Sequence, residues 1–287
     1  MFGRQRIAAL VAEFLGTGAL TLVIISVQRS TIGVPFFVAL GAGLTVALMT
    51  FLFGHVSGAH LNPALTIGMW TARKITTGKA IFYVGFQLLG AYAAYLLYTY
   101  FVDNKLSNIG GHYSSRVLTA EAVGALVLGF AAAAAVYQRF SNATTAAING
   151  LGYMLAIVAA SSVSLGIINP AVAFGAQAWV WGTYVLGPIL GAVIAINVYG
   201  LLFADRDVVI AGETAALASV SISETTIVEA PAKPTRSTRS TAARKPRAAA
   251  GTRSRSTTTR VAAKPASRSR STTARKSSTT TRRRKSS

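Results

Sequence analysis

The sequence predicts an all-α membrane protein with six transmembrane helices and two re-entrant half-helices, arranged as an inverted 3+3 repeat. Three observations predict this fold: the composition, the lengths of the apolar segments and a duplicated Asn-Pro-Ala motif. The 287-residue chain is 52% hydrophobic and only 13% charged, whereas soluble domains carry about 25% charged residues. It has no cysteine, which excludes disulfides, cysteine-ligated metal centres and cysteine nucleophiles.

Six apolar segments are long enough to cross a bilayer, which takes about 20 residues of helix. They lack the two-residue alternation of a membrane β-barrel, and their many glycines favour close helix packing. The six expected spans are 7–27, 34–53, 80–102, 118–137, 144–163 and 182–204.

Two shorter apolar segments, 63–71 and 170–180, are predicted to be half-length helices. Each covers about 15 Å as a helix, half the thickness of a bilayer. They begin with Asn62-Pro63-Ala64 and Asn169-Pro170-Ala171. Asparagine is a good helix N-cap and proline is favoured at the first helical position. We therefore expect each half-helix to start at its motif.

The two halves of the apolar region repeat each other. The two Asn-Pro-Ala motifs are offset by 107 residues, and Glu13 and Glu121 by 108, each after an alanine inside a span. Because each half has three spans, the second half must enter the membrane inverted relative to the first. The half-helices then enter from opposite faces, and their N-termini meet near the midplane with two asparagine amides between them.

These residues resemble the aquaporin, or major intrinsic protein, family over about residues 5–205. One Asn-Pro-Ala motif is a weak signal, but two at the repeat spacing, each opening a half-length helix, are strong. The other matching features are Ala12-Glu13-Phe14, Gly16-Thr17, the run 54–61 (Gly-His-Val-Ser-Gly-Ala-His-Leu), Gln87, Gly90 and Glu121.

The resemblance implies a passive channel, not an enzyme, in which water and small uncharged solutes pass in single file. The side-chain amides of Asn62 and Asn169 would donate hydrogen bonds to the permeant, in addition to capping their helices. The opposed half-helix dipoles would exclude protons and cations. The resemblance also implies a homotetramer with one pore per subunit, and it implies no cofactor.

Glu13 and Glu121 are mid-span carboxylates, which are costly in a membrane unless they are paired. One interpretation is a proton relay; the other is that each accepts hydrogen bonds from the backbone of its half's re-entrant loop. Their symmetric placement favours the second. His55 and His60 flank the first loop and are too few for a metal site; we expect His60 to lie beside the pore.

The sequence departs from the family at the expected selectivity filter. The second motif normally continues with arginine, but this chain has Val172. Counting back from Asn169 places two other filter positions at Ile157 and Gly166, and the resemblance of the second span to the family places the remaining one at Ala42. The filter therefore has no charge and no aromatic ring. The glycerol-conducting branch usually has aspartate at the next position, where this chain has Ala173.

Such a filter predicts one of two behaviours. It is wider and less polar than a water-selective filter and admits larger or less polar solutes, or it dewets and conducts poorly. The sequence alone does not choose among water, glycerol, a gas or another neutral solute.

The charge pattern predicts three regions: a channel domain at 1–207, a linker at 208–229 and a disordered basic tail at 230–287. The tail holds 18 of the 28 Lys and Arg residues and no acid, and it has too few apolar residues to form a core. The distribution of basic residues in the loops places both termini in the cytoplasm, in a multi-pass protein of the plasma membrane.

The tail has three readings: it binds anionic lipid, it binds nucleic acid without sequence preference, or it is a solvated segment with no partner. These readings supply an alternative function, a poorly conducting membrane tether whose tail binds nucleic acid or anionic lipid.

Overall fold

The computed structural model describes residues 3–204, and these residues are helices and connecting loops without a β-strand. The expected linker and basic tail lie outside the described residues. Six helices have the length and apolar composition to cross a membrane, as predicted. They are α1 (Arg4–Gln28), α2 (Pro35–Ser57), α4 (Thr77–Val102), α5 (Ser115–Tyr137), α6 (Asn142–Ala160) and α8 (Leu186–Leu202), the last preceded by the π-helical turn η1 (Trp181–Val185).

The two half-helices are α3 (Pro63–Thr71) and α7 (Pro170–Gly175), and both begin at the proline of their motif. The bounds of α3 agree with the prediction, but the predicted end of α7 at residue 180 is wrong. The chain leaves α7 at Gln177, which has a left-handed φ of 60°. The N–H of Ala178 then donates to the carbonyl of Ala173 at 2.8 Å, and these features together form a Schellman-type helix end.

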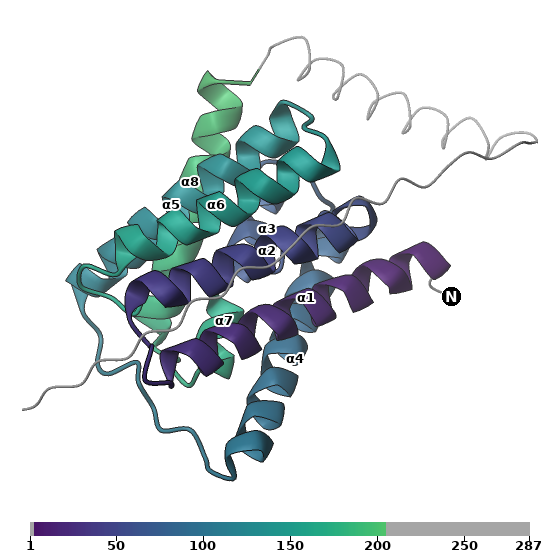
Figure 1. Ribbon diagram of the computed structural model, residues 1–287. Helices are drawn as coiled ribbons and strands as arrows, with labels where there is room; N and C mark the ends of the chain where they lie inside the picture. The colour runs from purple at the N-terminus through teal and green to yellow at the C-terminus, as the bar shows by residue number, and fades with distance from the viewer. Residues whose placement is uncertain (1–2, 205–287) are drawn as a thin grey trace, which may run out of the picture. The chain divides into compact units, whose positions relative to one another are not determined.

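The helices pack in three pairs: α1 with α4, α5 with α8, and α2 with α6. The first two pairs correspond to each other in the two halves, and the third joins the halves. Each half-helix also packs on the last helix of the opposite half, α3 on α8 and α7 on α4. The two halves are thus interlocked, with both half-helices inside the bundle (Figure 1).

The contact between α2 and α6 is made at two glycines. A Cβ atom on Gly43 would lie 2.7 Å from the carbonyl oxygen of Gly150, and a Cβ on Gly150 would lie 2.7 Å from that of Gly43. Both distances are shorter than van der Waals contact, so only glycine fits at this crossing. The backbones of the two halves meet here without side chains between them.

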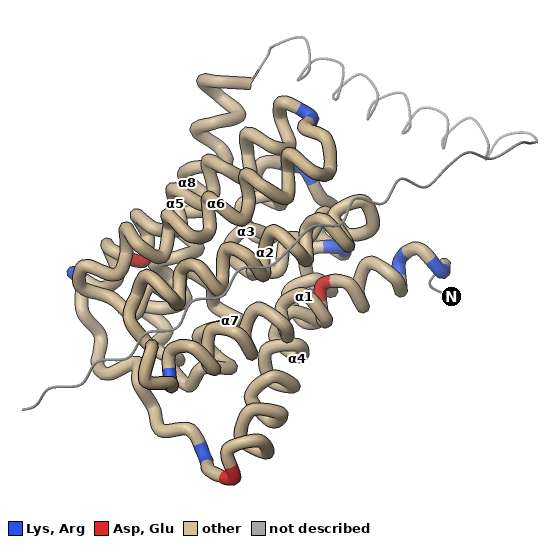
Figure 2. Tube along the Cα trace, in the orientation of Figure 1, with Lys and Arg blue, Asp and Glu red and all other residues tan. Residues whose placement is uncertain are grey.

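Charged residues are placed as a membrane requires. Figure 2 shows Lys and Arg gathered at the helix ends and in the loops. The carboxylates inside the described spans are Glu13 of α1 and Glu121 of α5, and both are fully buried. Large apolar side chains face outward, for example Leu44, Leu48 and Phe51 on one side of α2. The chain is therefore an integral multi-pass membrane protein.

Candidate functional site

The two Asn-Pro-Ala motifs form matching helix caps. The side-chain oxygen of Asn62 accepts a hydrogen bond from the N–H of Ala64 at 2.8 Å. The side-chain oxygen of Asn169 accepts from Ala171 at 3.0 Å and from Val172 at 3.4 Å. Both asparagines are buried. Since the oxygen of each amide makes the cap, its two N–H groups stay available for other partners.

Each asparagine uses one of those N–H groups to reach the opposite half of the chain. Asn62 donates to the carbonyl oxygen of Ile168 at 3.0 Å, and Asn169 donates to that of Leu61 at 2.9 Å. Ile168 and Leu61 are the residues immediately before the two motifs. The N-termini of the two half-helices are therefore tied to each other crosswise, at the centre of the bundle.

Glu13 on α1 binds the first re-entrant loop, which is the segment 58–62 between α2 and α3. Its carboxylate accepts hydrogen bonds from the hydroxyl of Ser57 at 2.7 Å and from the backbone N–H groups of His60 at 2.9 Å and Leu61 at 2.7 Å. The amide of Gln87 on α4 donates a fourth bond at 2.8 Å. The side chain is fully buried, and this set of donors offsets the cost of burying a carboxylate.

Glu121 on α5 binds the second re-entrant loop, the segment 161–169 between α6 and α7, in the same way. It accepts from the hydroxyl of Ser164 and from the backbone N–H groups of Ile167, at 3.0 Å, and Ile168. Each of these donors lies 107 residues after its counterpart in the first half. The bond from Gln87 to Glu13 has no counterpart in this set, because the three donors to Glu121 all belong to the second loop.

The held loops contain backbone conformations that are unfavourable for most residues. Leu61 and Ile168 have φ angles of 51° and 47°, and Gly166 has 65°. A branched or bulky residue in this left-handed region costs about 1–2 kcal/mol. The carboxylates bind the N–H groups of Leu61 and Ile168, so they stabilise the strained residues that aim the carbonyls at the asparagines.

Three of the expected filter residues, Ala42, Ile157 and Val172, are fully buried and belong to one apolar cluster. Gly166 lies beside Ile157, because a Cβ built on Gly166 would be 3.0 Å from the Ile157 side chain. The structure thus brings together segments of α6, the second loop and α7.

His60 is half-buried at the edge of the first loop. Its Nδ1 lies 3.1 Å from the hydroxyl of Thr66, and its ring packs edge-on against Tyr83, with the ring centroids 5.4 Å apart. The Gln87 amide donates to the same Thr66 hydroxyl at 3.0 Å. A position of His60 beside the pore stays a prediction.

One residue at the centre was missed by the sequence reasoning. Tyr153 on α6 is 1% exposed, and its hydroxyl oxygen lies 3.3 Å from the amide nitrogen of Asn169. One sequence feature could have pointed to it: Tyr153 precedes Ile157, an expected filter residue, by four residues and therefore shares its helix face.

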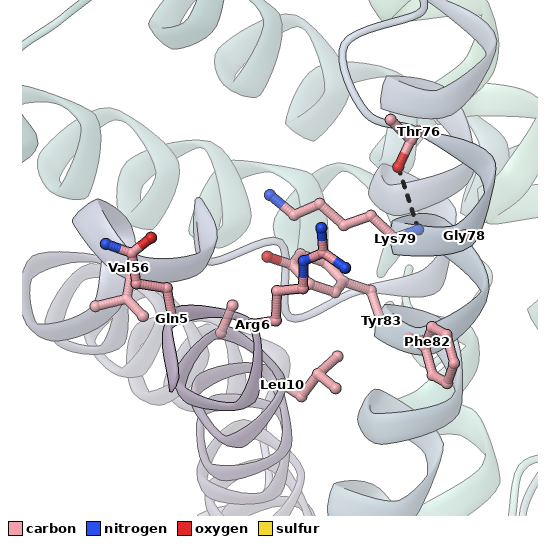
Figure 3. Close-up of a pocket in the computed structure, with 10 residues that line it drawn as sticks. Gln5, Arg6, Leu10, Val56, Thr76, Gly78, Lys79, Phe82 and Tyr83 are labelled. Atoms are coloured by element: carbon pink, nitrogen blue, oxygen red, sulfur yellow. Dashed lines mark hydrogen bonds between the residues drawn. The ribbon is translucent and has the colours of Figure 1, made fainter. Parts of the chain in front are cut away.

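A hollow of about 410 Å³ lies apart from this centre, between the first turns of α1 and α4 (Figure 3). Arg6, Lys79 and Tyr83 line it, together with residues of α1, α2 and the start of α4, but none of the half-helices or α6. Lys79 lies over the Tyr83 ring at 4.9 Å, and the Tyr83 hydroxyl donates to the carbonyl of Ser57 at 2.8 Å. The hollow therefore lies beside Tyr83, whose partner Ser57 donates a hydrogen bond to the Glu13 carboxylate that holds the first loop.

Comparison with known proteins places the chain in a family. The model of the major intrinsic protein family matches residues 3–199. The chain belongs to this family. The duplicated motifs, the six spans and the two interlocked half-helices are consistent with that membership.

Relatives include human aquaporin-4, which is 33% identical over 181 residues that cover 58% of this chain and 56% of the relative. The match thus spans little more than half of that protein's length. Aquaporin AqpM of Methanothermobacter thermautotrophicus is 27% identical over 235 residues, covering 67% of this chain and 96% of the relative.

Among solved structures, the aquaglyceroporin from Plasmodium falciparum matches with a TM-score of 0.58 at 21% identity, covering 69% of this chain and 96% of the other. At this identity the likeness concerns the fold. It agrees with the predicted arrangement of six spans and two half-helices.

Proposed function

We propose that the chain is a passive transmembrane channel for water and small uncharged solutes. The observation that carries the proposal is the crosswise pair of hydrogen bonds from Asn62 to Ile168 and from Asn169 to Leu61. These bonds orient both amides at the point where the half-helices meet. The relatives' names, aquaporin and aquaglyceroporin, support the same function.

The proposed passage runs between the halves, past the two amides. A permeating molecule accepts a hydrogen bond from an asparagine N–H that is not used in the crosswise bonds. The N-terminal ends of α3 and α7 face the same point from opposite sides, and their positive ends disfavour protons and cations there. Glu13 and Glu121 take no part in transport in this scheme, because their oxygens accept hydrogen bonds from the loops that they position.

The outer filter sets which neutral molecules enter. We propose that Ala42, Ile157, Gly166 and Val172 form it, so that it offers apolar walls and no cation. Cation exclusion then depends on the half-helices alone. Water loses hydrogen bonds over its whole surface at such walls, whereas a solute with some carbon surface loses fewer for its size, so small polyols and amides are expected to pass alongside water.

We propose the family's assembly and orientation for this chain as well: a homotetramer in the plasma membrane, with one pore per subunit and both termini in the cytoplasm. The charges at the helix ends support the orientation. Binding of anionic lipid or nucleic acid by residues 230–287 stays a prediction, and so does the tether as an alternative function.

Stopped-flow light scattering on proteoliposomes of the full chain tests the proposal. Water flow is measured after a shift in an impermeant osmolyte, and solute entry is measured with glycerol and urea. The matched control is N62D/N169D, which keeps an oxygen for each helix cap but removes the amide donors. Fast water or solute flow that the control loses supports the channel. Flow equal to empty liposomes for every solute, from a correctly folded preparation, contradicts an open channel.

A further inference from the structure

Tyr153 belongs neither to the expected filter nor to the two motifs, but its buried side chain contacts one of the motif asparagines. Its phenol is buried among apolar residues, and its hydroxyl contacts Asn169 at 3.3 Å. Tyr153 lies on α6, whereas Asn169 is the N-cap of α7. A buried phenol needs a hydrogen-bond partner, and here that partner is one of the two amides assigned to the permeant.

The amides of Asn169 and Asn62 differ in how many of their N–H groups have partners. An asparagine amide has two N–H groups. Asn169 directs its amide nitrogen to the Leu61 carbonyl and to the Tyr153 hydroxyl, so both of its N–H groups have partners. Among the described residues, the Asn62 amide nitrogen donates to the Ile168 carbonyl and has no such phenol beside it. The two halves are therefore alike in their caps and crosswise bonds, but not in what faces the permeant.

The position of Tyr153 along α6 is also fixed. Gly150 lies three residues earlier, at the crossing where α6 meets Gly43 of α2. Ile157 lies one turn later on the same face. The Tyr153 side chain therefore lies one helical turn from the expected filter residue Ile157 and contacts Asn169, so it adjoins both parts of the proposed passage. The side chains around this point are closed to water, with exposures of 0% for Ile157, Val172 and Asn169.

We propose that Tyr153 is the gate and a specificity-determining residue of the pore. This inference rests on the proposed channel function. In this proposal the phenol obstructs the passage and occupies the second Asn169 N–H. A permeating molecule must take over that hydrogen bond, and the ring must turn aside. Water, which donates and accepts in a small volume, needs the smallest displacement, so Tyr153 supplies the polar selection that the apolar filter lacks.

Two substitutions separate the two parts of the role. Tyr153→Phe removes the hydroxyl but keeps the ring, which frees the Asn169 N–H and releases the ring. We expect about a fivefold rise in water permeability, the factor that corresponds to one neutral hydrogen bond. Tyr153→Leu also removes the obstruction, and we expect it to raise glycerol entry at least tenfold. Both are measured on full-chain proteoliposomes by stopped-flow light scattering, normalised to the amount of folded oligomer.

Tyr83→Phe is the matched control. Tyr83 is also 1% exposed, and its hydroxyl makes one hydrogen bond, which it donates to the carbonyl of Ser57 beside the first loop, whereas the Tyr153 hydroxyl accepts from Asn169. A loss of packing or of a buried hydroxyl in general would change both variants alike. The gate predicts a rise for Tyr153→Phe and no rise for Tyr83→Phe.

The outcomes distinguish the gate from the channel itself. An impermeable wild type with a permeable Tyr153→Leu supports the gate, as does a permeable wild type that both Tyr153 variants accelerate. A permeable wild type with unchanged Tyr153 variants overturns the gate alone. Impermeable wild type, Tyr153→Phe and Tyr153→Leu together overturn the gate and the channel.

Discussion

Asn169 donates a hydrogen bond to the carbonyl oxygen of Leu61 at 2.9 Å, across 108 residues of sequence. The N–H of Leu61 donates in turn to the carboxylate of Glu13 at 2.7 Å. Leu61 therefore joins a carboxylate of the first half to a motif of the second half, and Ile168 joins Glu121 to Asn62 in the same manner. A substitution that distorts one loop should therefore also displace the asparagine amide of the opposite motif.

Glu13→Gln and Glu121→Gln test the two carboxylates. Each change replaces a carboxylate that accepts three or more hydrogen bonds with a neutral amide, and the N–H groups of this amide face some of the same donors. Hydrogen bonds to a charged group contribute about 1.5–3 kcal/mol each, so we expect a loss of at least about 2 kcal/mol in the free energy of unfolding. Thermal unfolding of the purified oligomer in detergent measures this loss.

Asp103→Asn is the control for both carboxylates. Asp103 lies at the C-terminal cap of α4 with a φ of 49°, a conformation that asparagine tolerates as well. Its unfolding temperature should match the wild type. If Glu13→Gln and Glu121→Gln were as stable as Asp103→Asn, the carboxylates would not be holding the loops.

Gly166→Ala tests the second loop at an expected filter residue. The alanine must adopt a left-handed φ of 65°, and its Cβ would lie 2.9 Å from the carbonyl oxygen of Ile157. We expect a loss of about 1–3 kcal/mol in the free energy of unfolding. Gly85→Ala is the contrast, since its Cβ would meet no atom of a neighbouring element within 4 Å and helix propensity favours alanine by about 1 kcal/mol. Equal stability of the two variants would contradict the strain at Gly166.

The sequence was informative about the fold because membrane helices depend on length and apolarity, which can be counted along the chain. Both half-helices start where the Asn-Pro-Ala motifs placed them, since capping is a local property. The end of α7 is different. Gln177 adopts a left-handed conformation that is rare for this residue type, and no local signal marks it.

The candidate site was only partly predictable, for a related reason. The repeated Asn-Pro-Ala motif identified Asn62 and Asn169, but not the partners of their amides, because Leu61 and Ile168 contribute backbone carbonyls that carry no sequence signal. Tyr153 was missed because a tyrosine in an apolar helix resembles any other core aromatic residue. Its contact with Asn169 depends on how α6 is placed against α7, which only the assembled bundle determines.

Val172→Thr tests whether the apolar filter limits water flow. Threonine has nearly the shape of valine, but it adds a hydroxyl that can hydrogen-bond to a passing molecule. Val172 is fully buried at the start of α7, and its N–H faces the Asn169 oxygen at 3.4 Å. If apolar walls raise the barrier for water, we expect this variant to conduct water at least threefold faster, with glycerol entry changed less.

The matched control for this change is Val158→Thr, which makes the same chemical substitution on the exposed side of α6, where Val158 is 46% exposed. It follows Ile157 directly but points away from the bundle. Water permeability of Val158→Thr should equal the wild type. A rise in water permeability of both variants would show that a threonine anywhere in these helices has this effect, which contradicts the filter. No rise for Val172→Thr would mean that water flow is limited at another position, and Tyr153 is the next one to change.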